Sequence, residues 1–145
     1  PIAAQAWPAL TRVSIDGYRT ADAARWKACF AGVADLELRG GKTDEWLAAN
    51  LDNPFCDWID RDAAVGKRAA AAWRTARAAL GAGVTAAAAS RVLKAFVAVF
   101  NAIDAKTGID TIDREEIAEA FIGLASEAGL DPAVAEARLD EWRDF

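Results

Sequence analysis

Residues Phe100–Phe121 read FNAIDAKTGIDTIDREEIAEAF, and this stretch decides the fold that we predict for the chain. It begins as the end of an apolar helix, passes through a short acidic loop, and continues as a second helix whose first turn is acidic. We interpret Asp113 and Glu116 as a capping box, in which Asp113 caps the second helix and Glu116 reaches back to the N–H of the cap. The stretch therefore predicts two helices joined by a loop.

Four carboxylates crowd the predicted loop, and such a cluster either binds a cation or repels itself. They belong to Asp104, Asp110, Asp113 and Glu116. The run resembles an EF-hand, whose pattern D-x-[DN]-x-[DN]-G-x5-E places oxygen ligands at alternate loop positions. Lys106 stands where a ligand belongs, Asp110 stands where the glycine belongs, and the loop of residues 104–116 is one residue too long. The resemblance implies these four residues as metal ligands, with calcium binding weakened or lost.

Over its whole length the chain is similar to the sarcoplasmic calcium-binding proteins and their bacterial relative calerythrin. Residues 12–23 correspond to a first, degenerate loop through Asp16-Gly17-Tyr18, although an ordinary Asp-Gly turn explains them equally well. Residues 61–73, with Gly66 at the turn, correspond to a second hand that has lost its ligands. The resemblance implies EF-hand-like helix–loop–helix pairs.

Composition favours one helical domain. The chain has 145 residues, of which 54% are hydrophobic, and only four are proline. Alanine, the strongest helix former, makes up about a quarter of the residues. We therefore predict an all-α fold of about seven helices in a single compact domain, residues 1–145. We predict no strand beyond short bridges at the loop centres near Tyr18 and Ile112.

Several helix boundaries follow from capping patterns. Thr85 is a predicted N-cap, Asn53-Pro54 and Asp131-Pro132 are predicted helix starts, and Gly129 is a predicted helix end. Two apolar stripes at helical spacing predict core faces. The stripes are Leu93, Phe96, Val97 and Phe100, and Ile117, Ala120, Phe121 and Leu124.

The charge distribution and the lack of long apolar segments limit the expected partners and the expected cellular location. The chain has a net charge of −5, and its acids concentrate after Asp104, so a nucleic acid is not a predicted partner. We find no apolar run long enough to span a membrane and no signal-peptide pattern, and we predict a cytoplasmic protein from a GC-rich bacterial gene. Cys29 and Cys56 lie in apolar helical surroundings, and we expect both to stay reduced.

The residue types present argue against hydrolase and kinase activities and suggest a cavity for a ligand. The chain has no histidine, no serine-based triad and no phosphate loop, so hydrolase and kinase activities have no support. Six tryptophans in an alanine-rich core suggest uneven packing and a ligand cavity. The candidate pocket residues are Trp26, Trp58, Trp73, Phe96, Phe100 and Phe121.

Acid–base chemistry has one candidate cluster beside Trp58. If one helix runs through Asp62, its carboxylate faces the core and could act as a general acid. Alternatively, Asp62 caps a helix that begins at Ala63. The candidate catalytic residues are Asp57, Asp60, Asp62 and Tyr18.

We therefore predict an EF-hand-like binding protein that has lost calcium binding or retains it only weakly, and that holds an apolar small molecule or a partner helix. The alternatives are a cofactor-independent enzyme of the cyclase, isomerase or lyase type, and a weak calcium buffer or sensor. Calcium is the one cofactor considered. A closed pocket at Trp58 or Trp73 favours a small ligand, and an open apolar groove favours a partner. The absence of methionine argues against a calmodulin-like groove.

Overall fold

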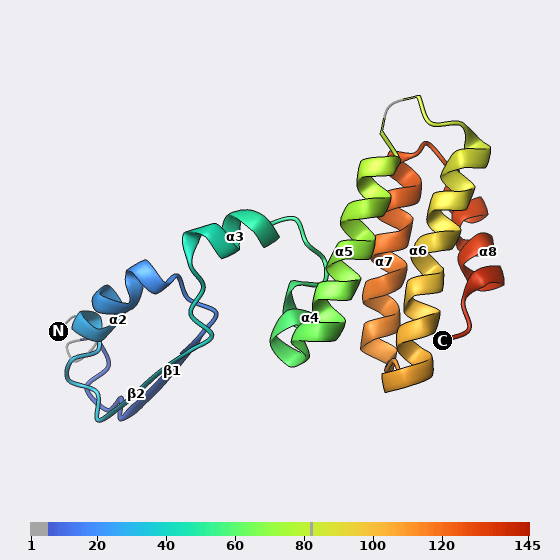
Figure 1. The fold of residues 1–145 in the computed structure, drawn as a ribbon. Coiled ribbons are helices and arrows are strands. Elements are labelled where there is room, and N and C mark those ends of the chain that lie inside the picture. The colour runs from blue at the N-terminus through green and yellow to red at the C-terminus, as the bar shows by residue number, and fades with distance from the viewer. Residues whose placement is uncertain (1–5, 82) are drawn as a thin grey trace. The chain divides into compact units, whose positions relative to one another are not determined.

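The computed structural model describes residues 6–81 and 83–145, and it is mostly helical, as predicted. Contacts divide the chain into two compact units, Pro1–Asp52 and Asn53–Phe145, where the sequence analysis expected one domain. The described residues form seven α-helices and one small sheet (Figure 1). The prediction that the chain has no strand is wrong.

The N-terminal unit alternates strands with short helices. In chain order it contains strand β1 (Arg12–Asp16), the 3-10 helix η1 (Thr20–Asp22), helix α2 (Ala23–Cys29), strand β2 (Asp35–Arg39) and helix α3 (Asp44–Asn50). The two strands are parallel. The segment expected to be a first degenerate loop is therefore strand β1, a glycine turn and a 3-10 helix.

The strands form because their side chains alternate between two environments. Val13 and Ile15 in β1 are half-buried, while the residues between and beside them are exposed. Such period-2 alternation, with β-branched residues on one face, is typical of a half-buried strand. On the other face Arg12 forms ion pairs with Asp35 at 3.2 Å and with Glu37 at 3.8 Å. The exposed face of this sheet is therefore charged.

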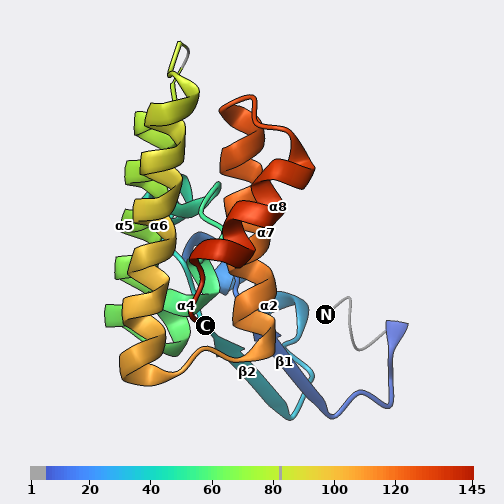
Figure 2. The same ribbon diagram turned by 90° about the vertical axis from the view of Figure 1, so that its right-hand side faces the viewer.

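The C-terminal unit is a bundle of helices. It contains α4 (Cys56–Arg61), α5 (Ala63–Ala79), α6 (Ala86–Thr107), α7 (Thr111–Glu127) and α8 (Pro132–Trp142). Helices α5, α6 and α7 run alongside one another, and α8 packs against α6 and α7 (Figures 1 and 2).

Local capping patterns correctly predicted the starts of α6 and α8 and the end of α7. Thr85 caps α6 and Asp131 caps α8, each by accepting backbone N–H groups of the first turn. Gly129, with φ at 74°, follows the end of α7. The predicted start at Asn53-Pro54 is early, because α4 begins at Cys56 and Asn53 instead accepts the N–H of Phe55.

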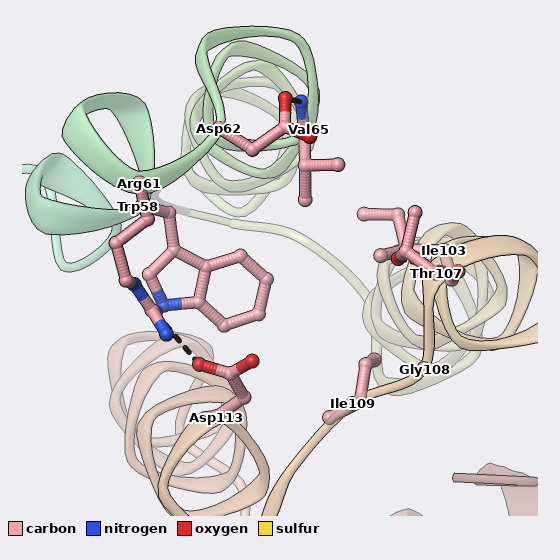
Figure 3. A pocket seen from close by; sticks show the side chains of 9 residues that line it. All are labelled: Trp58, Arg61, Asp62, Val65, Ile103, Thr107, Gly108, Ile109 and Asp113. Atoms are coloured by element: carbon pink, nitrogen blue, oxygen red, sulfur yellow. Dashed lines mark hydrogen bonds and ion pairs between the residues drawn. The ribbon is translucent and has the colours of Figure 1, made fainter.

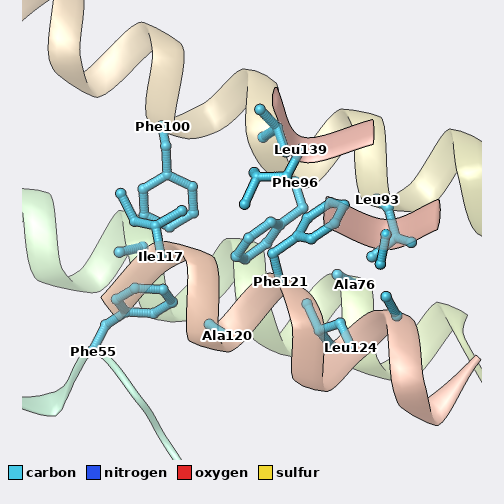
Figure 4. Packing of buried hydrophobic residues seen from close by; sticks show 14 of the residues in the cluster. Phe55, Ala76, Leu93, Phe96, Phe100, Ile117, Ala120, Phe121, Leu124 and Leu139 are labelled. Atoms are coloured by element: carbon cyan, nitrogen blue, oxygen red, sulfur yellow. The ribbon is translucent and has the colours of Figure 1, made fainter. Parts of the chain in front are cut away.

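One buried hydrophobic cluster contains residues from all five helices and from the segments between them. Both predicted apolar stripes lie in it, so those predictions are confirmed. Aromatic rings connect the helices: the ring centroid of Phe96 lies 4.9 Å from that of Phe100 and 6.5 Å from that of Phe121 (Figure 4). The ring centroid of Phe55, which precedes α4, lies 5.1 Å from that of Phe100.

Gly66 does not occupy a turn. It lies buried inside α5, where the backbone of α4 passes so close that an added Cβ would stand 2.3 Å from the nitrogen of Ile59. The glycine is therefore needed for a close contact between two helices, and the prediction of a turn at this position is wrong.

Candidate functional site

The junction between α6 and α7 differs from the predicted acidic loop. Helix α6 continues to Thr107, so Asp104 lies within it, and only Gly108–Asp110 connect the two helices. The N-cap of α7 is Asp110, whose carboxylate accepts the N–H of Asp113 at 2.8 Å. The predicted capping box of Asp113 and Glu116 is wrong, because capping occurs three residues earlier.

Each of the four predicted metal ligands accepts a hydrogen bond from the protein. Asp104 accepts the N–H of Ile109 at 2.8 Å, and Asp110 caps α7. Asp113 accepts a hydrogen bond from Arg61 at 2.6 Å, and Glu116 accepts one from the indole Nε1 of Trp58. Nowhere in residues 6–81 and 83–145 do three histidine, cysteine or acidic side chains gather as a metal site requires.

Trp58, Arg61, Asp113 and Glu116 form a polar cluster that ties α4 to α7. The guanidinium of Arg61 lies 5.4 Å from the ring centroid of Trp58 and 3.8 Å from the Glu116 carboxylate. Its hydrogen bond to Asp113 raises the pKa of Arg61 above its ordinary value.

A small pocket of about 160 Å³ opens beside this cluster (Figure 3). Ile103, Ile109 and Val65 form its apolar wall, and Arg61 and Asp113 form its charged side. Pockets that hold drug-sized ligands usually measure about 300–1,000 Å³. A cavity of about this size can hold one ligand as large as benzene, but not a drug-sized molecule.

Of the four predicted catalytic residues, Asp62 lines this pocket, and Asp57, Asp60 and Tyr18 do not. Asp62 caps α5 by accepting the N–H groups of Ala64 and Val65, so the capping alternative for Asp62 is confirmed. Asp57 and Asp60 are exposed, and Tyr18 belongs to the N-terminal unit.

Both cysteines are free thiols, as predicted. The thiol of Cys56 contacts the Asp57 carboxylate at 3.5 Å. Burial, followed by the negative charge of Asp57, raises the pKa of the Cys56 thiol. Cys56 is therefore less of a thiolate at neutral pH than an ordinary cysteine, which does not suit a nucleophile.

The predicted pocket residues separate into three settings. Trp58, Phe96, Phe100 and Phe121 belong to the buried cluster, and their rings contact one another or Phe55. Trp73 packs half-buried at the edge of that cluster. Trp26 lies in the N-terminal unit, where it stacks on Phe30.

A larger apolar groove of about 420 Å³ lies between α5 and α6. Apart from Thr75 and Arg68, its lining is apolar and consists of alanine and valine side chains and of Phe96, one of the predicted pocket residues. The lining residues are Arg68, Ala71, Ala72, Thr75, Ala76, Ala79, Val92, Ala95, Phe96 and Val99. The sequence analysis did not identify this groove, because an alanine at helical spacing looks the same whether it faces the core or an open surface.

The groove continues along the same two helices into a smaller hollow of about 130 Å³. The two hollows share Arg68, and the second is also lined by Val65, Ile103 and Lys106. Every charged residue that lines either hollow is a cation, namely Arg68 or Lys106. We call this continuous surface of α5 and α6 the α5–α6 groove.

Helix α6 is apolar on two faces. Leu93, Val97 and Phe100 lie buried in the core, while Val92, Ala95 and Val99 line or border the groove. By length and composition alone, the 22-residue helix α6 could cross a membrane, and 33% of its most apolar stretch is buried in this structure. The sequence analysis found no run of this kind.

No protein-family model, no curated protein and no solved structure matches this chain. The EF-hand resemblance therefore stays a prediction, and the function has to be argued from the geometry above.

Proposed function

We propose that the C-terminal unit is a binding module that works without calcium, and that its α5–α6 groove holds the apolar face of an acidic amphipathic helix from a partner protein. The observation that carries the proposal is the second apolar face of α6. An apolar face of a helix is normally covered by another element. Within residues 53–81 and 83–145, the face of α6 along Val92, Ala95 and Val99 remains open as a groove.

The lining of the groove suits a helix. Alanine side chains are short, so a third helix can approach α5 and α6 closely and fit its side chains between theirs. Recognition of an amphipathic helix by an apolar groove is a common mode of peptide binding. Arg68 and Lys106 favour a partner with acidic residues beside its apolar stripe, because opposite charges orient the two surfaces.

Small-ligand binding and catalysis have weaker support. The aromatic rings of the core contact one another, and the pocket at Trp58 has a volume of only about 160 Å³. The carboxylate of Asp62 is engaged in capping α5. A cofactor-independent enzyme would need an acid and a base that converge on one cavity, and no carboxylate lines the larger α5–α6 groove.

The groove is tested with a synthetic helical peptide of 17 residues, the length of α5, with leucine and alanine on one face and glutamate on the other. We expect the full chain to bind this peptide, with an affinity that falls as salt screens the charges. Ala79→Glu and Ala95→Glu place a carboxylate in the groove, and each should weaken binding about tenfold or more, since a desolvated like charge is costly. Fluorescence anisotropy of a labelled peptide measures the effect.

Two matched controls lie on the same helices. Ala78 and Ala98 are exposed and do not line the groove, so Ala78→Glu and Ala98→Glu should leave the affinity unchanged. Equal loss in all four variants would contradict the proposal. Failure of the unmodified chain to bind the peptide, together with its sedimentation on phosphatidylcholine vesicles, would assign the groove to a membrane surface instead.

Calcium is expected to have no effect on this protein at millimolar concentration. The reason is that all four predicted ligands already accept hydrogen bonds from protein donors, and Arg61 neutralises Asp113. Isothermal titration should show no heat above dilution, and the melting temperature should not change. A saturable calcium heat that disappears in Asp113→Asn would restore the alternative of a weak calcium buffer.

A further inference from the structure

The N-terminal unit repeats its backbone structure at an interval of 23 residues. Arg12 pairs with Asp35 and Asp16 pairs with Arg39, so each residue of β1 lies opposite the residue 23 positions later. An isolated bridge between Arg19 and Lys42 keeps the same interval. Two strands aligned in this way are successive turns of a parallel coil.

The turns that flank the strands repeat at the same interval. Gly17 and Gly40 follow the strands with φ at 67° and 59°, a left-handed conformation that favours glycine. Before the strands, the N–H of Leu10 donates to the carbonyl of Trp7 at 3.0 Å, and the N–H of Val33 donates to that of Phe30 at 2.9 Å.

The helices follow the interval as well. Cys29 is the last residue of α2, and Ala6, 23 positions earlier, is also helical. One coil is thus a strand, a glycine turn, a helix and a return turn, of which residues 12–34 form one complete copy. Solenoids that place one strand and one helix in each repeat have periods of about 20–29 residues.

These coils lack a complete core. No hydrophobic residue of the described part of the N-terminal unit, residues 6–52, belongs to the buried set. Trp7 is 60% exposed, whereas Phe30 at the matching position of the next coil is half-buried. A single solenoid repeat cannot bury its apolar face alone, and at least about three repeats are needed for stability.

The chain itself does not extend the stack beyond β2. The strand that would follow β2 at the same interval corresponds to residues 58–62, and these form the end of α4 and the cap of α5. The edge of β1 that faces away from β2 has no strand beside it in residues 6–81 and 83–145. A free parallel edge of this kind presents unpaired N–H and C=O groups for one more strand.

We infer that the free edge of β1 is a docking edge for one more coil of the same 23-residue repeat. The strand of that coil is parallel to β1 and carries the pattern shared by Val13-Ser14-Ile15-Asp16-Gly17 and Leu36-Glu37-Leu38-Arg39-Gly40, in which apolar residues alternate with polar ones before glycine. The added coil places its apolar strand residues beside Val13 and Ile15 and so extends the apolar interior. This inference concerns the N-terminal unit and does not depend on the function proposed for the α5–α6 groove.

The test duplicates one coil within the full chain, by inserting a second copy of residues 12–34 between Thr11 and Arg12. We expect the inserted copy to fold in register, and we expect the amide hydrogens on the former free edge of β1 to exchange about tenfold more slowly, because each gains a partner. Hydrogen exchange followed by mass spectrometry measures this. The thermal transition of the N-terminal unit should also rise.

The matched control carries the same insertion with Val13→Asp and Ile15→Asp in the inserted copy only. Its inserted strand cannot face the apolar interior, and exchange at β1 should remain as in the unmodified chain. The inference is overturned if both insertions give the same exchange and the same melting temperature. It is also overturned if the unmodified chain already protects β1 more strongly as its concentration rises, because a second copy would then be the occupant.

Discussion

Phe100→Ala is expected to lower the free energy of unfolding of the C-terminal unit by about 3–5 kcal/mol, the usual cost of removing a buried phenyl ring. Phe100 is fully buried, and its ring centroid lies within 6 Å of those of Phe55, Trp58 and Phe96, at 5.1, 5.9 and 4.9 Å. This loss of stability is the sum of two terms: the transfer free energy of the phenyl ring, and the cost of the cavity that it leaves among three other rings. Since a domain is stable by only about 5–15 kcal/mol, the variant should lose a large share of its stability.

Urea denaturation followed by far-ultraviolet circular dichroism measures this effect. Phe30→Ala is the matched control, because Phe30 is half-buried and belongs to the N-terminal unit. It should leave the transition of the C-terminal unit in place. A loss below about 1 kcal/mol in Phe100→Ala, which is the size of an ordinary surface effect, would show that the aromatic cluster does not hold the bundle together.

Gly66→Ala should destabilise the protein, whereas Gly123→Ala should stabilise it, although both glycines lie inside helices. A Cβ on Gly66 would stand 2.3 Å from the nitrogen of Ile59 and 2.5 Å from the carbonyl carbon of Trp58. These are backbone atoms, which cannot rotate away, so α4 must move off α5. Overpacking of this kind costs about 1–3 kcal/mol or more.

Gly123→Ala should change the stability in the opposite direction, because the space around Gly123 is open. Nothing lies within 4 Å of a Cβ built on it, so only the helix propensity changes, and alanine gains about 0.8–1 kcal/mol over glycine. Thermal unfolding of both variants decides the matter. If Gly66→Ala were as stable as Gly123→Ala, the close contact between α4 and α5 would be refuted.

The Gly66 variant has a second readout. Because α4 carries Trp58 and Arg61, displacement of α4 should break the hydrogen bond from Trp58 to Glu116 and separate Arg61 from Asp113. Tryptophan fluorescence should then shift to longer wavelength as the indole becomes exposed. Gly123→Ala should leave the emission unchanged.

The helical boundaries show where sequence reasoning works and where it does not. Asp62, Thr85 and Asp131 were identifiable as caps because a cap bonds N–H groups only two or three residues away. Asp110 and Asp113 were confused because each has an acidic residue three positions later, so the local pattern fits both. Tertiary contacts decide which of the two is the cap, because Arg61 donates a hydrogen bond to Asp113 and Trp58 donates one to Glu116.

The sheet was missed for a related reason. Its strands have only five residues each, and the pairing of Arg12 with Asp35 joins positions 23 apart, beyond any local periodicity. The spacing of Gly17 and Gly40, and of Thr20 and Thr43, was the available signal. With two copies that share few identical residues, that signal becomes clear only once the backbone register is known.

By itself, the sequence determined the helical class of this protein, the starts of α6 and α8, the end of α7 and the apolar stripes of α6 and α7, because propensity, capping and periodicity act within a few residues along the chain. The tertiary structure alone decided which alanines line an open groove, which carboxylates are held by Arg61 and Trp58, and which strands stack as coils. These features depend on contacts between side chains and backbone groups that are distant in sequence. Such contacts contribute to stability only once the segments that carry them have packed.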